Sequence, residues 1–551
     1  MGTDRSWRCL ATHPPMTAKQ LLFDAEAREK ILRGATLLAN AVRVTLGPKS
    51  KCVLIDKAWG DPIVCNDGVT IAKEVQLENP TENLGARMMR QAAERTGEEV
   101  GDGTTTATLL AHAIFSEGIR NVAAGASAID LKRGLDRGVR AAVAALRELS
   151  RPVRTLREKV QVATISAHND ASIGELVAEA VEKVGGDGVI SVEEAKGIET
   201  RLEVVEGMQF DRGYLSPYFV TNPERMECVL EQSLILLTDR RIAVLKDILP
   251  ILEEVVKMGR PLLIVAEEIE GDALATLVVN KVRAALLCVA VKAPGFGDRR
   301  KATLQDMAVL TGAELASEEV GLKLEHLQVS QLGTARRVVV SRETTTIIQG
   351  GGDPKAIRDR IEQVRHEMRD TKSDYDREKL EERLARLTGG VAVIHVGAPT
   401  EAELKSRKEA FDDAIHATKA AVAEGIVPGG GLALLRAIVA VEREEAQCDG
   451  DERTGLAILK HALTVPTRQI AMNSGADGAV VVERIRTGKD STGFDAARGT
   501  YVDLFEAGII DPMKVVRLAL ENAVSVASVL LLTEATLAEE QPSKPEAMPA
   551  A

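Results

Sequence analysis

The residues best suited to chemistry form one short stretch, residues 101–108, which reads Gly-Asp-Gly-Thr-Thr-Thr-Ala-Thr. Glycines let the backbone approach a ligand closely, and the free N–H groups at a helix start attract anions. A carboxylate inside a phosphate cradle repels the phosphate unless a hard cation such as Mg²⁺ lies between them. The stretch therefore indicates a nucleotide–metal site, and the simpler interpretation is a capped helix after a glycine turn. It lacks the Gly-x-x-x-x-Gly-Lys-Ser/Thr order of a P-loop, which excludes that family.

Glycine, aspartate and threonine gather in four further places: residues 45–49, Asp67-Gly68, Asp413 together with residues 427–431, and Asp511-Pro512. The Pro-Gly-Gly-Gly run in residues 427–431 precedes an apolar helix. Its backbone can therefore pass close to a ribose or a phosphate, or it is only a flexible start of that helix. Asp413 lies in an amphipathic helix, where a lone aspartate is most often solvated. The eight histidines form no His-Glu-x-x-His, so we expect no zinc site.

Helices must hold these groups of glycine, aspartate and threonine residues in place. Apolar residues recur at helical spacing in three runs, and the second run leads directly into residues 101–108. We therefore expect residues 21–148 to form a mainly helical block, with a turn at Asn66-Asp67-Gly68. The runs are Ile31, Ala35, Leu38 and Val42; Leu84, Met88 and Ala92; and Leu131, Leu135, Val139 and Leu146.

The middle of the chain changes period. Two short apolar runs each follow a helical run, which predicts α/β order with a partly parallel sheet. A helical hairpin follows, and from residue 425 we expect helices up to residue 537. One inserted domain explains this order, with the two helical ends folding together. The helix–strand pairs are 249–256 with 262–266 and 274–279 with 286–291, and the hairpin arms are 357–368 and 380–387.

Composition limits the class of protein. The 551 residues exceed one core and indicate three or four domains of roughly 150 residues each. The net charge of −12 argues against nucleic acid as the main partner. The six cysteines form no Cys-x-x-Cys, which indicates reduced thiols in a cytoplasmic compartment. The sequence contains no run of roughly 20 apolar residues, so we expect no membrane helix. We expect residues 1–16 and 540–551 to be disordered.

Seven long motifs follow one another in a fixed order, and in this order they resemble the motifs of group I chaperonins of the bacterial GroEL type. The resemblance extends from about residue 17 to residue 539. The motifs are Thr-Leu-Gly-Pro-Lys at 45–49, Asn-Asp-Gly-Val at 66–69, the stretch 101–108, Gly-Met-Gln-Phe-Asp-Arg-Gly-Tyr-Leu-Ser-Pro-Tyr at 207–218, Lys-Ala-Pro-Gly-Phe-Gly-Asp at 292–298, Ser-Asp-Tyr-Asp-Arg-Glu-Lys-Leu at 373–380 and Asp-Ala-Ile-His-Ala-Thr at 413–418.

The resemblance implies a multidomain α and α/β fold. Both chain ends would form a mainly helical equatorial ATPase domain (17–148 and 425–539). A small α/β intermediate hinge domain (149–206 and 391–424) would connect it to an inserted α/β apical domain (207–390). Pro152, Gly207, Gly390 and Gly425 occupy the family's hinge positions, where residues must absorb large changes in φ and ψ. The family forms two stacked seven-membered rings with a lid-like co-chaperonin of the GroES type.

The resemblance also implies an ATP site. Asp102 would bind Mg²⁺, Asp413 would position and deprotonate the attacking water, and Asp67 would assist. K⁺ would lie near the carbonyls of Thr45 and Asn66 and the hydroxyl of Thr105. The remaining nucleotide-binding positions are Gly103, Thr104, Thr105 and Thr106 at the phosphates; Leu46, Gly47 and Gly68 through their backbone; Gly430 and Asp511 at the ribose; and Pro48, Ile165, Asp495, Ala496 and Ala497 around the adenine.

Non-native polypeptides and the co-chaperonin would bind an apolar groove, which suits broad specificity. Two pairs of the residues carried over from the family lie at helical spacing, so on pattern alone they are equally explained as core residues. Each buried apolar side chain contributes roughly 1.5–3 kcal/mol, so one groove binds weakly and a ring gains avidity. The residues are Tyr214, Tyr218, Phe219, Leu249, Leu252, Leu274, Val278 and Val279.

The chain departs from the family pattern at several positions. Asn66 replaces a frequent Lys, and Asp495 replaces a common Asn near the adenine, which could alter nucleotide affinity. Pro428 stiffens the glycine loop where Ala is common, and the tail lacks Gly-Gly-Met repeats. Arg468 and Asp477 match a ring–ring ion pair of the family. These departures suit a secondary chaperonin copy.

The leading hypothesis is an ATP-driven protein-folding chamber. The first alternative is a non-cycling or single-ring chaperonin that binds polypeptides as a scaffold and has a weak ATPase. A small-molecule kinase is disfavoured because no motif for a second substrate is visible. The presence of both Asp102 and Asp413 favours turnover over the scaffold.

Overall fold

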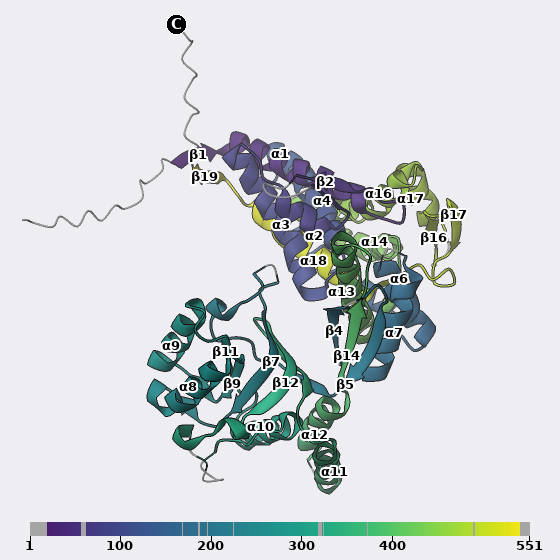
Figure 1. Cartoon of the computed structure of the whole chain (residues 1–551). Helices are drawn as coiled ribbons and strands as arrows, with labels where there is room; N and C mark the ends of the chain where they lie inside the picture. The colour runs from purple at the N-terminus through teal and green to yellow at the C-terminus, as the bar shows by residue number, and fades with distance from the viewer. Residues whose placement is uncertain are drawn as a thin grey trace, which may run out of the picture. The chain divides into compact units, whose positions relative to one another are not determined.

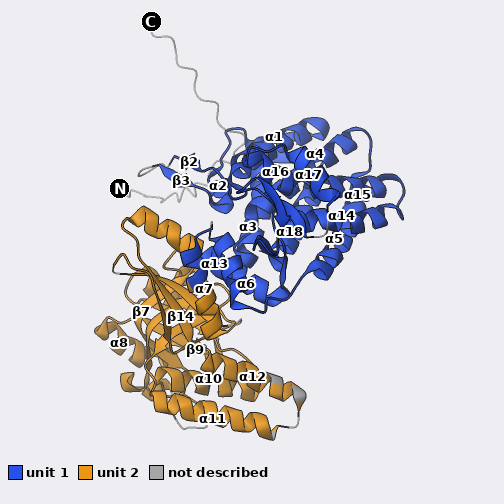
Figure 2. Cartoon of the chain, turned by 90° about the vertical axis from the view of Figure 1, so that its right-hand side faces the viewer, with its two compact units in different colours: residues 1–175, 412–551 blue, residues 176–411 orange. Residues whose placement is uncertain are grey.

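The computed structural model of the chain (Figure 1) describes residues 19–56, 62–167, 169–185, 188–195, 197–223, 225–317, 322, 324–371, 373–488 and 491–539. It contains two compact units (Figure 2). Unit 1 combines residues 1–175 with 412–551, and unit 2 comprises residues 176–411. The segments expected to be disordered, 1–16 and 540–551, lie outside the described residues.

Unit 1 is mainly helical and is built from both ends of the chain. Its helices are α1 (Asp24–Val42), η1 (Arg43–Thr45), α2 (Gly68–Glu74), α3 (Pro80–Val100), α4 (Thr104–Ala123), α5 (Ala128–Leu149), α6 (Leu156–Ser166), α14 (Leu432–Glu445), α15 (Gly450–Ala462), α16 (Val465–Asn473), α17 (Gly478–Arg486) and α18 (Met513–Leu531). Two helices cross the boundary between the units along the chain, α7 (Ala171–Val184) and α13 (Glu401–Glu424).

The described part of unit 1 also contains four antiparallel pairs of strands. They are β1 (Lys19–Phe23) with β19 (Ala535–Glu539), β2 (Val53–Ile55) with β3 (Ile63–Cys65), β15 (Ile426–Pro428) with β18 (Ile510–Pro512), and β16 (Thr492–Asp495) with β17 (Thr500–Asp503).

The core of unit 1 consists mostly of Ala, Leu, Ile and Val, as the low aromatic content requires. Helix α18 packs against α3, α4 and α5. Helices α1 and α3 cross at two glycines. A Cβ on Gly34 would lie 1.8 Å from the carbonyl oxygen of Glu82, and one on Gly85 would lie 2.2 Å from that of Ile31. These glycines therefore let the two backbones touch.

Two sequence-based expectations for unit 1 are corrected. The segment after residue 425 is not helical throughout, because the strand pairs β15–β18 and β16–β17 interrupt it, and residues 535–539 form β19 rather than the end of a helix. Figure 1 shows β19 beside β1, so the first and the last described strands pair with each other. The turn signal at Asn66-Asp67-Gly68 marks a helix start: Asp67 is the N-cap of α2 and accepts bonds from the backbone of Val69 and Thr70.

Unit 2 is α/β, and its partly parallel sheet confirms the prediction from periodicity. The six-stranded sheet has the order β11-β9-β7-β12-β13-β6, with β11, β9 and β7 parallel and the other three antiparallel. These strands are β6 (Gly207–Phe210), β7 (Cys228–Leu237), β9 (Leu262–Ala266), β11 (Cys288–Lys292), β12 (Gly333–Val340) and β13 (Thr345–Gly350).

Helices and smaller sheets complete unit 2. The buried carboxylate of Asp306 accepts hydrogen bonds from Arg360 and Arg383, which ties the expected helical hairpin, α11 and α12, to α10. The remaining elements are η2 (Pro217–Phe219), η3 (Leu245–Asp247), α8 (Leu249–Met258), α9 (Gly271–Val282), α10 (Gly297–Thr311), η4 (Leu324–His326), η5 (Val329–Gln331), α11 (Pro354–Asp370), α12 (Asp374–Thr388), the sheet of β4 (Val189–Glu194), β14 (Val391–Val396) and β5 (Arg201–Val205), and the pair β8 (Arg241–Ile242) and β10 (Glu268–Ile269).

Candidate functional site

The loop after α1 is held in place by a residue that is far away in the sequence. The side-chain amide of Asn473, at the end of α16, donates to the carbonyl oxygens of Arg43 (2.9 Å) and Leu46 (2.8 Å). Gly47 has φ +94°, which favours glycine, and the side chain of Ile470 lies 3.2 Å from where its Cβ would be. Asn473 could not be predicted from the sequence, because its partners lie more than 400 residues away. The segment of Thr45, Leu46, Gly47 and Pro48 is thereby held against α16.

The start of α2 meets the start of α4. A Cβ on Gly68 would lie 2.4 Å from the hydroxyl oxygen of Thr105 and 3.0 Å from that of Thr104. The hydroxyls of Thr45 and Thr105 are 3.1 Å apart and share a hydrogen bond. The structure therefore gathers Thr45, Gly68, Thr104 and Thr105, which the sequence assigns to phosphates and K⁺. Asp67 beside them caps α2 with both carboxylate oxygens, at 3.2 and 2.7 Å.

Asp102 lies between two left-handed glycines. Helix α3 ends at Gly101 (φ +69°), and α4 starts after Gly103 (φ +77°), which has no side chain to cap it. The first N–H groups of α4, at Thr104, Thr105 and Thr106, lack partners within the helix and favour an anion. The Asp102 carboxylate accepts from the Gly103 backbone through Oδ1 and from the Ser166 hydroxyl through Oδ2 at 3.0 Å. Ser166 was not predicted from the sequence.

A second carboxylate faces this loop. In β18, Asp511 pairs with Val427 of β15, and a Cβ on Gly429 would lie 3.0 Å from its Oδ1. Burial, and after it the negative charge of Asp102, raise the pKa of Asp511 to about 7. The two carboxylates thus lie close enough for the charge of one to affect the protonation of the other. The next residue of the glycine run, Gly430, has φ +62°, and its carbonyl accepts from the Thr467 hydroxyl at 3.1 Å.

Helix α13 brings Asp413 to the same region. Its C-terminal half packs on both sides: Ala417 and Ala421 join Val162, Ile426 and Ile510 in one apolar cluster, and Ala420 joins Val100, Val515 and Leu518 in another. At its end, Glu424 accepts bonds of 2.6 and 3.0 Å from Arg517 of α18. This hydrogen-bonded pair lowers the pKa of Glu424 and raises that of Arg517.

The imidazole of His416 lies against the backbone of Gly101, since a Cβ there would be 2.6 Å from the His416 Cβ. Asp413 precedes His416 by three residues, or about 4.5 Å of helical rise. The structure therefore places Asp413 within about one turn of the loop that carries Asp102.

The predicted adenine side is formed by β16 and the turn after it. Asp495 is almost fully buried, and its Oδ1 accepts from the backbone of Ala497 (3.0 Å) and Arg498 (3.1 Å). Its other oxygen is 3.4 Å from the Arg498 guanidinium. The departure from the common Asn is thus accommodated locally, because an amide oxygen could accept the same two backbone bonds. Ala496 is buried and belongs to the main core, whereas Pro48 is exposed.

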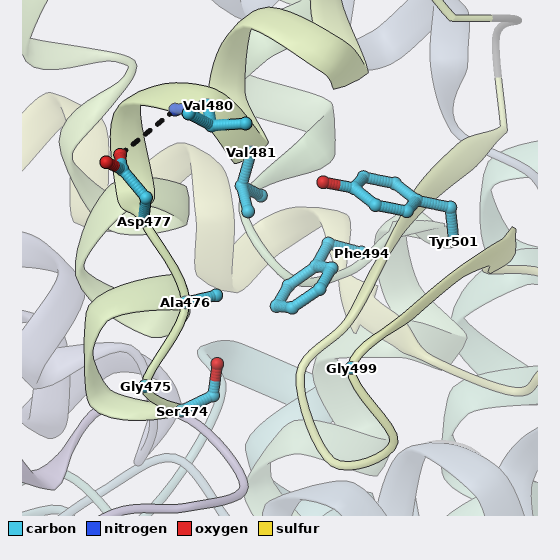
Figure 3. A pocket seen from close by; sticks show the side chains of 9 residues that line it. All are labelled: Ser474, Gly475, Ala476, Asp477, Val480, Val481, Phe494, Gly499 and Tyr501. Carbon is cyan, nitrogen blue, oxygen red and sulfur yellow. Dashed lines mark hydrogen bonds between the residues drawn. The ribbon is translucent and has the colours of Figure 1, made fainter.

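A cavity of about 390 Å³ lies beside this turn, not in the predicted nucleotide site (Figure 3). The rings of Phe494 and Tyr501 line one side, with their centroids 5.3 Å apart. Residues 474–477, Val480 and Val481 line the other, and among them Asp477 caps α17 through the backbone of Ala479 and Val480. Asp477 is the predicted partner of a ring–ring ion pair, and in this chain it serves as a helix cap.

The residues fit a nucleotide with Mg²⁺. Asp102 and Asp511 bring two carboxylates together, which a cation would compensate, and the start of α4 offers N–H groups to phosphates. Among the described residues, no group of three His, Cys, Asp or Glu side chains could hold a metal ion by itself. Mg²⁺ typically needs only one or two carboxylates when substrate phosphates and water complete its shell. The donor set therefore suits a metal that arrives with a nucleotide.

In unit 2, the predicted polypeptide-binding residues divide by exposure. Tyr218 (67%), Leu249 (41%) and Val279 (44%) are exposed, whereas Phe219 and Leu252 are buried in the core. Tyr214, Leu274 and Val278 are partly buried and pack against that core. A cavity of about 490 Å³ lies between the start of η3 and α9, and Val279 lines it together with Val244, Leu245, Lys246, Asp272, Ala275 and Thr276.

The four predicted hinge residues lie at the ends of elements or between them. Gly390 (φ +59°) separates α12 from β14, and Gly425 (φ +84°) follows α13. Gly207 starts β6, and Pro152 precedes α6. Positive φ at Gly390 and Gly425 explains glycine there, because other residues are strained in this conformation. In the part of the chain that the structure describes, no helix is long and apolar enough to cross a membrane.

Comparison with known proteins agrees with the resemblance seen in the motifs. Residues 38–541 match the TCP-1/cpn60 chaperonin family. Over 534 residues the chain is 68% identical to Chaperonin GroEL 5 of Bradyrhizobium diazoefficiens, a match that covers 97% of this chain and 99% of that protein. The resemblance to bacterial group I chaperonins is thereby confirmed, and the chain belongs to the TCP-1/cpn60 chaperonin family.

Proposed function

We propose that this chaperonin captures non-native polypeptides on unit 2 and folds them in a ring cavity, in a cycle driven by ATP hydrolysis in unit 1. The observation that carries the proposal is the meeting of the loop 101–103 with α13, because it brings Asp102 and Asp413 to one region. Family membership and the similarity to Chaperonin GroEL 5 support the same activity.

In the proposed site, the start of α4 binds the phosphates through the N–H groups and hydroxyls of Thr104, Thr105 and Thr106. Because Gly68 has no side chain, the phosphates can also approach the start of α2. Asp102 would hold Mg²⁺, which supplies positive charge to the phosphate oxygens when bound. Thr45, Asn66 and Thr105 would hold K⁺. Asp413 orients the attacking water and accepts its proton. Such a site acts by positioning and electrostatics, without a covalent intermediate.

The nucleoside part would lie on the other side of the loop. Gly430 and Asp511 would contact the ribose. A Cβ at position 429 would lie close to the Asp511 carboxylate, so glycine there leaves this carboxylate open to a ligand. Pro48, Ile165 and the segment 495–497 enclose the adenine. The role of Asp67 is to assist Asp413, although its two oxygens also cap α2.

In unit 2, we propose that the cavity beside α9 is the binding groove for extended apolar segments. Val279 and Leu249 present apolar surface, and Tyr218 offers a ring with a polar end. Phe219 and Leu252 support this surface from the core. A co-chaperonin lid of the GroES type would bind the same groove, and ATP would favour the state in which the groove is withdrawn from polypeptide.

Assembly into rings is part of the proposal. Unit 1 exposes apolar side chains on two small strand pairs: Leu21, Phe23 and Leu537 on β1 and β19, and Leu54 and Val64 on β2 and β3. Exposed apolar strands of this kind mark contact surfaces between chains. We propose that these surfaces join copies of the chain into heptameric rings, and that two rings stack into a tetradecamer.

We further propose three domains with the boundaries stated for the family, moving about Pro152, Gly207, Gly390 and Gly425. Domain closure would bring the full length of α13 into its working position, so hydrolysis would wait for closure. None of the five described cysteines forms a disulfide, and burial raises the pKa of Cys228 and of Cys288 to about 12. Cysteines outside disulfides suit a cytoplasmic protein.

The test is Asp413→Ala, compared with Asp412→Ala on the same helix. We expect Asp413→Ala to bind ATP as the original protein does and to hydrolyse it at least about 100-fold more slowly, because the proton acceptor is lost. Asp412→Ala should keep most of the activity. Equilibrium nucleotide binding and single-turnover phosphate release measure the two quantities. Unchanged phosphate release in Asp413→Ala would remove Asp413 from the mechanism.

A further inference from the structure

His416 lies so close to the backbone of Gly101 that no residue with a side chain fits at position 101 without a shift of one of the two. A Cβ on residue 101 would lie 2.6 Å from Cβ of His416 and 2.8 Å from its Cγ and Nδ1. The imidazole therefore occupies the space that a side chain at position 101 would need. Two features favour glycine at position 101: its left-handed φ of +69°, and the close approach of α13, which leaves no room for a side chain.

The ring of His416 is held in a defined place. Its Nδ1 is 2.8 Å from the carbonyl oxygen of Asp412, one turn earlier in α13. The next residue, Ala417, is buried in the cluster with Val162 and Ile510, and Ala420 is buried against Val100, which directly precedes Gly101. The backbone of α13 is thus anchored one turn beyond His416, and the imidazole, although exposed on its outer side, lies against the loop at Gly101.

The same contact joins the two acidic residues of the proposed mechanism. Asp102 follows Gly101 in the chain, and Asp413 precedes His416 by three residues, about 4.5 Å along the helix. A small movement of the ring against the loop would therefore change the distance between Asp102 and Asp413. Displacements of about 1 Å in a catalytic arrangement can lower a rate by about 100-fold.

We propose that His416 is a positioning residue for ATP hydrolysis, whose ring sets how closely α13 approaches the loop that carries Asp102. The inference rests on the proposed function, since it assumes that Asp413 acts on a nucleotide bound at that loop. The ring acts through its shape. Its nitrogens are not required to transfer a proton or to touch the nucleotide.

Three substitutions separate shape from chemistry. His416→Ala removes the ring, and we expect kcat to fall about tenfold with the Kd for ATP unchanged, because α13 loses its spacer. His416→Phe keeps a planar ring of similar size, and we expect it to restore kcat to within about threefold of the original value. Gly101→Ala adds bulk from the opposite side, and we expect a kcat loss of at least about tenfold.

His461→Ala, an exposed histidine of α15, serves as the control and should leave kcat unchanged. Particle mass and thermal unfolding of every variant show that the chain still folds and assembles. The inference is overturned if His416→Ala retains the original kcat, if His416→Phe is as slow as His416→Ala, or if the loss lies in ATP affinity alone.

Asp413→Ala, measured in parallel, keeps this inference distinct from the proposed function. If the original protein hydrolyses ATP and Asp413→Ala does not, while His416→Ala behaves as the original protein, only the positioning role of His416 fails. If Asp413→Ala hydrolyses ATP at the original rate, the proposed function itself fails.

Discussion

The hydroxyl of Ser166, at the last position of α6, donates a hydrogen bond of 3.0 Å to Oδ2 of Asp102. The two residues are 64 positions apart, and the bond fixes a carboxylate whose other oxygen is bonded to the backbone of Gly103. Partners of this kind orient the ligands of a metal and affect its affinity. The side chain of Asp102 is therefore held in one orientation just before the start of α4.

We expect Ser166→Ala to raise the Mg²⁺ concentration needed for half-maximal ATP hydrolysis by about tenfold, since hydrogen bonds to charged groups are worth about 1.5–3 kcal/mol. The rate at saturating Mg²⁺ should change much less. A magnesium titration of the ATPase at fixed ATP measures both. Ser172→Ala is a matched control, because Ser172 also donates to a carboxylate, that of Asp170 at 2.6 Å, which has no role in the proposed nucleotide site. Equal shifts in the two variants would contradict a specific role for Ser166.

The helices around this site were predictable, but the contacts that complete it were not. The run of Leu84, Met88 and Ala92 predicts α3 because its period is a local property of the sequence. Ser166 and Asn473 left no such signal, because a single serine or asparagine gains its role only from residues brought together by the fold.

Some local sequence patterns occur in two different kinds of structure, and for these the prediction from sequence was wrong. Asn66-Asp67-Gly68 is equally a turn and a helix start, and the backbone bonds to Asp67 decide for the helix. Residues 535–539 form β19 only because β1, more than 500 positions earlier, pairs with them. In unit 2, the spacing of Leu249 and Leu252 predicts one face of α8, but not that Leu249 is exposed and Leu252 buried.

The groove of unit 2 predicts a separation of binding from hydrolysis. We expect Val279→Ser to weaken capture of a chemically unfolded test protein several-fold, because removing an exposed apolar side chain from a binding surface forfeits up to about 1.5–3 kcal/mol per site. Basal ATP hydrolysis should stay unchanged, since the residues proposed to bind the nucleotide all belong to unit 1. Val439→Ser, a half-exposed valine of α14 in unit 1, is the control. Normal capture by Val279→Ser would count against the groove.

The exposed strand pairs of unit 1 predict the effect of a charge on assembly. Val64 in β3 is 67% exposed. If the proposed assembly is right, we expect Val64→Lys to lower the particle mass below that of a tetradecamer, because an unpaired charge would be buried between copies. Ile198→Lys in unit 2 introduces the same charge at a side chain that is also 67% exposed and should leave the mass unchanged. Native mass measurements with and without ATP decide, and an intact Val64→Lys particle would exclude this surface.

His112 predicts how the stability of unit 1 depends on pH. Its Nε2 is 3.0 Å from the Thr36 hydroxyl in the contact between α4 and α1, and burial, followed by the charge of Arg43, lowers its pKa from 6.5 to about 4. Between these values the unfolded chain binds the proton and the folded chain does not. Protonation therefore favours unfolding as the pH falls from about 6.5 to about 4, by up to about 3 kcal/mol.

We expect His112→Gln, which has no titrating group, to lose less stability over this interval than the original protein. The quantity to compare is the change in the free energy of unfolding between pH 7 and pH 4.5, from denaturant titrations at each pH, since the substitution also alters stability at neutral pH. The slope isolates the proton-linked part, because other titrating groups contribute equally to both proteins. Parallel pH profiles for the two proteins would show that His112 is protonated in the folded state as readily as in the unfolded chain.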